Sequence, residues 1–267
     1  MCRMLLVSVS GFYAWCKREE SFHDREDRRL AVLVEEAYVR GRRTYGSPRV
    51  HAALAAKGVK VSRKRVIRLM QQRGLRGRTP RAFTRTTESV DGAAAAENLL
   101  NRDFTATAPN QKWVGDVTGL RVPEGWLYLA VLMDLYSRRI VGWALSPIND
   151  RKLALKALNA AVLSRQPTPG LLHHTDQGSP YVSEQYQEAL LDLGATCSMS
   201  RRGNCHDNAA MESWNASMKK DIGEKFESYD DAHRKIFDYI EVFYNQVRIH
   251  SANDNRSPAE YERAGFA

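Results

Sequence analysis

Three acidic residues occupy positions where a carboxylate is costly unless a cation compensates its charge. Asp116 interrupts an apolar strand pattern, Asp176 closes a second strand, and Glu212 lies one turn into a predicted helix. Burying a carboxylate in apolar surroundings is unfavourable without a paired charge or a metal ion. Because two strands and a flanking helix can bring three carboxylates together, this pattern predicts a shared cation site. The alternative is that the three acids are unrelated surface or capping residues.

Two further acids near these positions favour structural roles. Asp134 ends a predicted strand, and we expect it to cap the turn at Tyr136 and Ser137. Asp207 lies five positions before Glu212, on a different face of the helix, and it suits an N-cap.

Composition indicates a folded protein without a membrane segment. The 267 residues are 43% hydrophobic, which is enough for a core and excludes a disordered chain. The longest apolar run, Leu127–Met133, is far shorter than the roughly 20 residues of a membrane span. No signal peptide is evident, so we expect a cytoplasmic protein. The cysteines form no CxxC pair, which argues against a zinc site and predicts free thiols: Cys2, Cys16, Cys197 and Cys205.

The positive charge is concentrated near the N-terminus. The net charge is +9, but residues 1–90 hold 21 Lys and Arg against 8 Asp and Glu. The remainder of the chain holds 19 basic and 23 acidic residues. Basic residues that displace counterions from phosphates give affinity for nucleic acid. The uneven split therefore favours nucleic-acid binding over a merely solvated surface.

Residues 1–75 are predicted to form a small all-α region. A helix start capped at Ser8 is followed by helices at Asp24–Arg40, Arg49–Lys57 and Ser62–Gly74. Three short helices with a tight turn before the most basic one resemble a helix-turn-helix unit. A packing module without DNA contact is the alternative. The basic side chains of the last helix suit phosphates or guanine edges, and we expect DNA contacts from Arg63, Lys64, Arg65 and Arg68.

Residues 76–104 are predicted to be a basic linker, because they combine Gly77, Pro80, several threonines and a run of alanines with little apolar periodicity. Its arginines suit contact with a DNA backbone: Arg76, Arg78, Arg81 and Arg85.

Residues 105–267 have an α/β pattern. Three strands are predicted in quick succession, at Lys112–Leu120, Leu127–Met133 and Arg139–Leu145. Helices and short strands then alternate: a helix at Asp150–Ser164, a strand ending near His174, a helix at Ser183–Leu193, a strand at Ala195–Met199, and helices at Asp207–Lys220 and Asp230–Tyr244. This order predicts a mixed five-stranded sheet with helices on both faces.

The 35 residues between Asp176 and Glu212 match the hallmark of the DDE transposase and retroviral integrase superfamily, which this sequence resembles. More closely, it resembles OrfB-type transposases of bacterial insertion sequences of the IS-three family. Seven strings in the same order carry this resemblance: Tyr45-Gly-Ser-Pro-Arg, Pro109-Asn-Gln-Lys-Trp, Asp134-Leu-Tyr-Ser-Arg-Arg-Ile-Val-Gly-Trp, Asp176-Gln-Gly-Ser-Pro-Tyr, Gly203-Asn-Cys-His-Asp-Asn-Ala, Tyr244-Asn-Gln-Val-Arg-Ile-His and Ser257-Pro-Ala-Glu-Tyr.

The resemblance implies an RNase H-like catalytic domain, preceded by the helix-turn-helix domain, that cleaves and joins DNA strands. Its three acids would be catalytic and would hold two Mg²⁺ ions, for which Mn²⁺ can substitute, with Asp116 bridging both ions and Asp176 and Glu212 each binding one. Magnesium takes hard oxygen ligands, and two such ions can activate the attacking oxygen and stabilise the leaving one. Because magnesium prefers oxygen, structural roles are favoured for the nearby histidines: His173, His174 and His206.

The resemblance also suggests further contacts. Asn208 and Lys219 lie on the Glu212 face of their helix, and both are expected to contact the bound DNA end. In the C-terminal helix, apolar residues are predicted to be core: Phe237, Ile240, Val242, Phe243 and Tyr244. The string containing Tyr244, Asn245, Arg248 and His250 has no role that follows from its residues, and packing against the catalytic domain is the default expectation.

The expected partners are the element's DNA ends and target DNA, with a homo-oligomer that brings two ends together. Family members usually carry a helical segment before the string that begins at Ser8. Two interpretations fit this start equally: a product completed by frameshifting with an upstream OrfA-type helix-turn-helix protein, or a truncated copy. Two functional alternatives also stay open, namely a nuclease that cleaves without joining and an inactive remnant that binds DNA.

Overall fold

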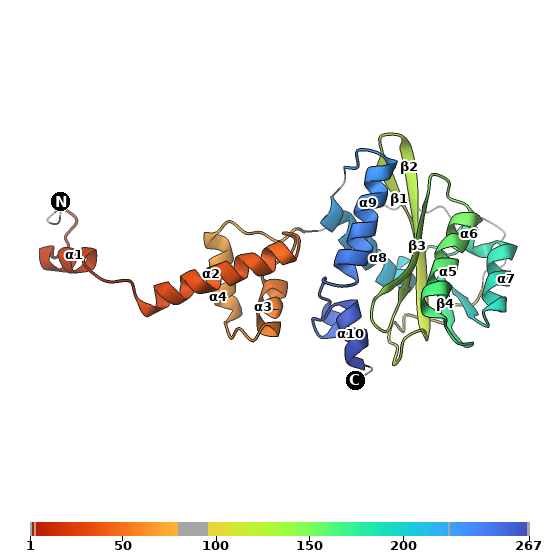
Figure 1. Cartoon of the computed structure of the whole chain (residues 1–267), viewed down its shortest axis with the longest axis horizontal. Helices are drawn as coiled ribbons and strands as arrows, with labels where there is room; N and C mark the ends of the chain where they lie inside the picture. The colour runs from red at the N-terminus through yellow and green to blue at the C-terminus, as the bar shows by residue number, and fades with distance from the viewer. Residues whose placement is uncertain (1, 3, 80–95, 224, 266–267) are drawn as a thin grey trace. The chain divides into compact units, whose positions relative to one another are not determined.

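The chain forms two compact units, Met1–Gly77 and Arg78–Ala267. The computed structural model describes residues 2, 4–79, 96–223 and 225–265 (Figure 1). The middle of the expected linker, residues 80–95, lies outside the described residues. Among the described helices, none is long and apolar enough to cross a membrane.

The first unit is helical, with α1 (Val9–Cys16), α2 (Phe22–Arg40), α3 (Ser47–Ala56) and α4 (Arg63–Gln72). Serine side chains cap three of these helices at Ser8, Ser21 and Ser62. The helix α2 begins two residues earlier than predicted because Ser21, rather than a later residue, accepts the hydrogen bond from the Asp24 amide. Helices α2, α3 and α4 pack together around buried apolar side chains: Leu30, Val34, Val50, Leu54, Val66 and Leu69.

The second unit is built on a mixed five-stranded sheet with the order β3-β2-β1-β4-β5. Its strands are β1 (Lys112–Val122), β2 (Gly125–Asp134), β3 (Ile140–Ser146), β4 (Leu172–Thr175) and β5 (Thr196–Met199). The first three strands form an antiparallel meander, whereas β4 and β5 run parallel to β1. The predicted sheet is therefore confirmed.

Helices cover both faces of this sheet (Figure 1). One layer contains α5 (Arg151–Arg165), α6 (Ser179–Val182) and α7 (Glu184–Asp192). Its core joins Trp113 and Leu132 of the strands to Leu158 and Leu190 of the helices. The other layer contains α8 (Ala209–Ile222), α9 (Tyr229–Phe237), a π-helix (Asp238–Tyr244) and α10 (Pro258–Gly265).

The C-terminal helical region differs from its prediction. The expected single helix changes at Asp238 from α to π geometry. Buried residues recur at Ile236, Tyr239, Ile240, Phe243 and Tyr244, which is the i, i+3, i+4, i+7 stripe of one helical face. The prediction that Phe237 and Val242 are core is wrong, because they lie off this stripe and are 49% and 51% exposed.

Part of the predicted linker belongs to the second unit. Leu100 is buried, and the amides of Leu99 and Leu100 both donate to Ser198 Oγ on β5. The segment that precedes β1 therefore packs against the far edge of the sheet.

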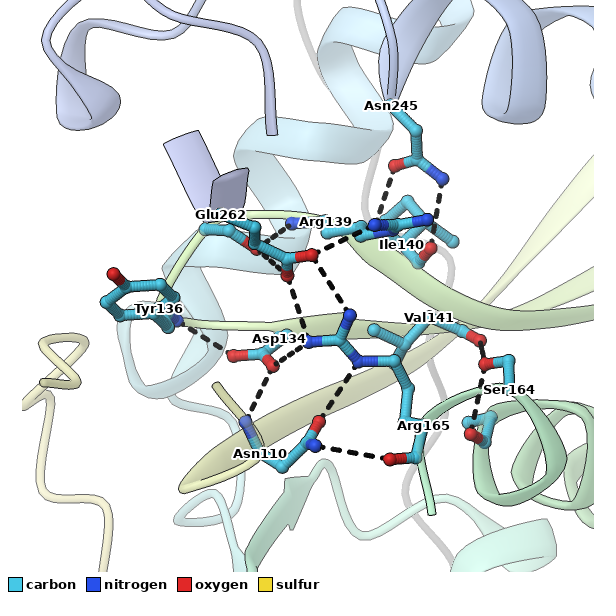
Figure 2. Close-up of polar contacts among 12 residues, drawn as sticks. Asn110, Asp134, Tyr136, Arg139, Ile140, Val141, Ser164, Arg165, Asn245 and Glu262 are labelled. Atoms are coloured by element: carbon cyan, nitrogen blue, oxygen red, sulfur yellow. Dashed lines mark hydrogen bonds and ion pairs between the residues drawn. The ribbon is translucent and has the colours of Figure 1, made fainter. Parts of the chain in front are cut away.

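A buried polar network joins α10 to the sheet and to α5. The Arg165 guanidinium bonds to Asp134 Oδ2 at 3.2 Å and to both Glu262 oxygens at 2.9 and 3.0 Å (Figure 2). Asp134 also accepts from the Tyr136 amide, which confirms its predicted turn cap, and from the Asn110 amide. Asp134 therefore does more than cap a turn, since it is one of two acids that anchor Arg165.

Candidate active site

The pairing of β1 with β4 places Asp116 beside Asp176. Lys112, Trp113 and Val114 pair in parallel with Leu172, His173 and His174, an offset of 60 positions. Asp116 and Asp176 are also 60 positions apart. If the β1–β4 register is extended by two residues, the two acids stand opposite each other. Neighbouring strands lie about 4.8 Å apart. The sheet itself therefore joins two of the three acids.

Gly115, next to Asp116, stands where side chains of the neighbouring strands leave little room. A Cβ atom at this position would lie 2.7 Å from Leu132 Cδ2 and 3.2 Å from Thr175 Cγ2. A side chain at position 115 would therefore have to displace the Leu132 side chain of β2 and press on the Thr175 methyl group of β4.

Two asparagines at and near the start of α8, the helix that carries Glu212, hold it against β1. Asn208 Nδ2 donates to the Gly115 carbonyl at 3.0 Å, and Asn215 Nδ2 donates to Asp116 Oδ2 at 2.6 Å. Asn208 is the N-cap of α8, and Asn215 stands three positions after Glu212 on the same face of the helix. The face of α8 that carries Glu212 and Asn215 therefore packs toward Asp116.

Electrostatics link the three acids. The pKa of Asp116 is raised to about 8, first by burial and then by the charge of Asp176, with a smaller contribution from Glu212. Burial also raises the pKa of Asp176, while a hydrogen bond from the Gly178 amide opposes that shift. Among the described residues, no three acids, histidines or cysteines form a ready-made metal cluster. The charges of Asp176 and Glu212 nevertheless both act on Asp116, which makes the three acids a candidate site.

The two histidines that precede Asp176 on β4 are buried and neutral. Burial lowers the pKa of His173 to about 3 and that of His174 to about 4. His173 bonds to the Tyr186 hydroxyl, and His174 bonds to the hydroxyls of Ser198 and Ser200. These two histidines therefore belong to the core, as expected, whereas His206 is exposed.

Asp207 is not the N-cap that the sequence predicts. It lies in a 3₁₀ turn (Cys205–Asn208), and α8 begins only at Ala209. Its buried carboxylate bonds to Arg102, Arg201 and Asn98. The two arginines lower the pKa of Asp207, and Arg201 makes the largest contribution. Asp207 therefore ties the segment before β1 to the loop before α8.

The two predicted DNA contacts on α8 occupy different surroundings. Asn208 is 6% exposed and is committed to Gly115, which favours a structural role over contact with DNA. Lys219 is half-buried, and its pKa is lowered by burial while the Asp116 charge opposes that shift. The Lys219 ammonium therefore stands within electrostatic reach of Asp116.

The four basic residues of α4 also divide into two pairs. Arg65 and Arg68 both bond to Asp27 of α2 at 2.6 Å. Arg63 and Lys64 are exposed at the start of the helix. Arg65 and Arg68 thus hold α4 against α2, and Arg63 and Lys64 are better placed to meet a phosphate.

Two residues near the acids were missed by reasoning from the sequence. Asn215 orients Asp116, and its position three residues after Glu212 was the signal that could have revealed it. The pKa of Tyr181 is raised by burial and then by the charges of Tyr186, Asp116 and Asp176. The signal that could have revealed it is the string Asp176-Gln-Gly-Ser-Pro-Tyr, which ends at Tyr181.

The raised pKa of Asp116 predicts a pH-dependent stability in the absence of metal. A carboxyl group whose pKa is raised in the folded state stabilises the fold fully at pH values below its unfolded-state pKa of 3.8. This stabilisation is lost as the pH rises towards the folded-state pKa of about 8. With a chelator at pH 8, Asp116→Asn should therefore exceed the wild type in stability by about 1 kcal/mol or more. Denaturant melts from pH 4 to 8 would measure this, with the exposed Asp192→Asn as control. Equal pH profiles for wild type and Asp116→Asn would contradict it.

Comparisons with known proteins agree with this architecture. Residues 24–83 match the HTH-like domain family, and residues 106–205 and 193–258 match two families described as Integrase core domain. In structure, the chain resembles a chain of the simian T-cell lymphotropic virus intasome in complex with PP2A regulatory subunit B56 gamma, with a TM-score of 0.50 and 15% identity, covering 79% of this chain and 69% of that one. This likeness concerns the fold.

Full-length relatives are more specific. The chain is 42% identical over 263 residues to an uncharacterized 31 kDa protein of insertion element IS600 from Shigella sonnei, covering 98% of this chain and 97% of that protein. It is 40% identical over 271 residues to the transposase InsF for insertion sequence IS3A from Escherichia coli K12, covering 100% of this chain and 94% of that protein. With this similarity along its whole length and an integrase core around its acidic residues, the chain belongs to the IS3 family of insertion-sequence transposases.

Proposed function

We propose that Asp116, Asp176 and Glu212 are the catalytic residues of this transposase and hold two divalent metal ions, Mg²⁺ or in its place Mn²⁺. The observation that carries the proposal is the shared offset of 60 positions between β1 and β4, which supports a position for Asp176, just after β4, beside Asp116 of β1. The asparagine contacts that turn the Glu212 face of α8 onto Asp116 support it.

The donor set fits a hard cation. Carboxylate oxygens are the ligands that Mg²⁺ prefers. The pKa of Asp116 is raised first by burial and then by the charge of Asp176, and a bound divalent ion would offset both effects. The buried Oδ1 atoms of Asn208 and Asn215 have no hydrogen-bond partner among the described residues, and each is a further polar atom beside β1. Metal ions in such a site stabilise the attacking and leaving oxygens of an in-line displacement at phosphorus.

The protein's own groups would orient the reactants. Asn215 holds one oxygen of Asp116, and the Gly178 amide holds one oxygen of Asp176, so both carboxylates keep a defined direction. Lys219 would meet a phosphate of the DNA end beside Asp116. One such site serves two reactions, in which water and then the freed 3′-hydroxyl of the element attack a phosphodiester.

A strand-transfer assay tests this proposal. The chain is incubated with labelled element ends, target DNA and Mg²⁺. Joined products that disappear with a chelator would support it. Cleaved products without joining would identify a nuclease, and retarded DNA without either product would identify a DNA-binding remnant.

We further propose that Arg63 and Lys64 contact phosphates of the element end. Each neutralised phosphate contributes about 0.9 to the slope of log affinity against log salt concentration. The double variant Arg63→Gln/Lys64→Gln should therefore weaken DNA binding and reduce this slope by about 2. Arg65→Gln serves as the control, since Arg65 bonds to Asp27 and should leave the slope nearly unchanged. Fluorescence anisotropy across a salt series measures both, and equal slopes in wild type and double variant would exclude these contacts.

The assembly that this reaction needs is also a proposal. Joining two element ends to one target calls for at least two active sites, and a homo-oligomer on bacterial DNA in the cytoplasm would supply them. An upstream OrfA-type helix-turn-helix protein, or a fusion with it, would add recognition of the terminal repeats.

A further inference from the structure

We infer that Asn245 and Arg248 are positioning residues of the active site, which hold the helix carrying Glu212 against the sheet carrying Asp116. The inference rests on the proposed catalytic role of these acids. It also assigns a purpose to the string Tyr244-Asn-Gln-Val-Arg-Ile-His, which the sequence leaves unexplained.

Asn245 fixes the end of the π-helix to the sheet. Its Oδ1 accepts from the Ile140 amide and its Nδ2 donates to the Ile140 carbonyl, both at 3.0 Å (Figure 2). Asn245 is 1% exposed, and its own carbonyl accepts from the Ala259 amide. Ile140 begins β3, which pairs with β2, and β2 pairs with β1 along its whole length. The side-chain amide therefore gives the C-terminal segment a fixed register on the sheet.

Arg248 fixes the same segment to α8. Its Nε donates to Asp221 Oδ2 at 2.9 Å, and both side chains are almost completely buried. Asp221 stands in the last turn of α8, two residues after Lys219. Arg248 follows Asn245 by three positions, so one short segment contacts both the sheet and α8.

Aromatic packing fills the space between the two anchors. Trp214 of α8 lies edge-on to Tyr239 and Tyr244 of the π-helix, with ring centroids 6.4 and 6.0 Å apart. Such contacts stabilise the helix pair but tolerate small sliding motions, because the hydrophobic effect is non-directional. The buried ion pair is directional and contributes little net stability. Its effect is therefore to set where α8 lies along β1, and with it the positions of Glu212 and Lys219.

The test compares ion-pair variants with a matched control. Arg248→Met removes the charge and keeps bulk, while Asp221→Asn keeps a hydrogen-bond acceptor and is the milder change. Glu262→Gln is the control, because it weakens another buried ion pair of the same unit on α10. For each variant we would measure the Mg²⁺ concentration for half-maximal joining, the rise in melting temperature on adding Mn²⁺ without DNA, and DNA affinity without metal.

Residues that orient metal ligands typically change metal affinity by about 10- to 100-fold. We expect Arg248→Met to need about tenfold more Mg²⁺ and to show a smaller Mn²⁺-induced rise, with Asp221→Asn shifted in the same direction. DNA affinity should stay at the wild-type value in both. Glu262→Gln should lose thermal stability yet keep the wild-type metal dependence.

Equal metal dependence in Arg248→Met and Glu262→Gln would overturn the inference. If Arg248→Met does not fold, unchanged metal dependence in a folded Asp221→Asn would overturn it instead. Failure of the proposed function gives a different result, in which wild-type joining ignores Mg²⁺ or Glu212→Gln joins as well as the wild type.

Discussion

Glu212→Gln should lose strand transfer by about 10³-fold or more while binding DNA ends with wild-type affinity. Glutamine keeps the size of the side chain but removes the charge and one hard oxygen ligand. Divalent ions contribute several kcal/mol of charge stabilisation in the transition state, and each 1.36 kcal/mol corresponds to tenfold in rate. Losing about 4 kcal/mol therefore produces a loss of this size.

Separate measurements distinguish this loss from misfolding. Joining would be followed by gel electrophoresis of labelled products, and DNA binding by anisotropy in the presence of chelator. Glu188→Gln on the exposed side of α7 is the control, because it removes an acid of the same unit away from the site. Full joining by Glu212→Gln would refute the assignment of this residue.

The same substitution has an electrostatic consequence. The Glu212 charge contributes to the raised pKa of Asp116, so removing it should lower that pKa. The pH dependence of stability in chelator should therefore become shallower in Glu212→Gln than in the wild type.

Arg165→Ala should be the most destabilising of the ion-pair variants, at about 3–5 kcal/mol. The side chains of Asp134 and Glu262 are 0% and 7% exposed, and Arg165 bonds to both. Removing it leaves two buried carboxylates with less compensating charge. For a unit of this size the melting temperature should fall by on the order of 10 °C.

Urea unfolding followed by tryptophan fluorescence would measure this loss. The method reports mainly on the second unit, because Trp15 is the sole tryptophan outside it. Arg151→Ala is the control on the same helix, since its partner Gln185 is neutral and exposed. A loss below about 1 kcal/mol in Arg165→Ala would show that the network contributes little.

The pH dependence of this loss has a definite sign. Burial raises the pKa of Glu262, but hydrogen bonds and charge from Arg165, with Ser137 and Arg139, outweigh it and hold the pKa below 4.5. That contribution is present above the unfolded value and disappears as the pH falls. The difference between wild type and Arg165→Ala should therefore be largest near neutral pH and shrink in acid.

Local patterns in the chain were sufficient to predict most elements and to single out the three acids as candidates. Apolar periodicity predicted the strands and most helices, because burial on one face is written into residues a few positions apart. Serines before helix starts predicted caps, since a cap involves residues within three positions. The 60 positions between Asp116 and Asp176 equal the register offset between β1 and β4. This agreement could be recognised only once the strand pairing was known.

Contacts between distant residues were decided by the tertiary structure. Asp27 pairs with Arg65 and Arg68. Asp207, predicted to be a cap, instead pairs with two arginines. Glu262 of α10 pairs with Arg165. Apart from the pair Asp207–Arg201, these pairs join side chains at least 38 positions apart. The residues around a charged side chain do not indicate which distant opposite charge will be its partner. Asn245 and Arg248 remained unexplained for the same reason. Their partners, Ile140 and Asp221, lie beside them only because the sheet and α8 have already packed.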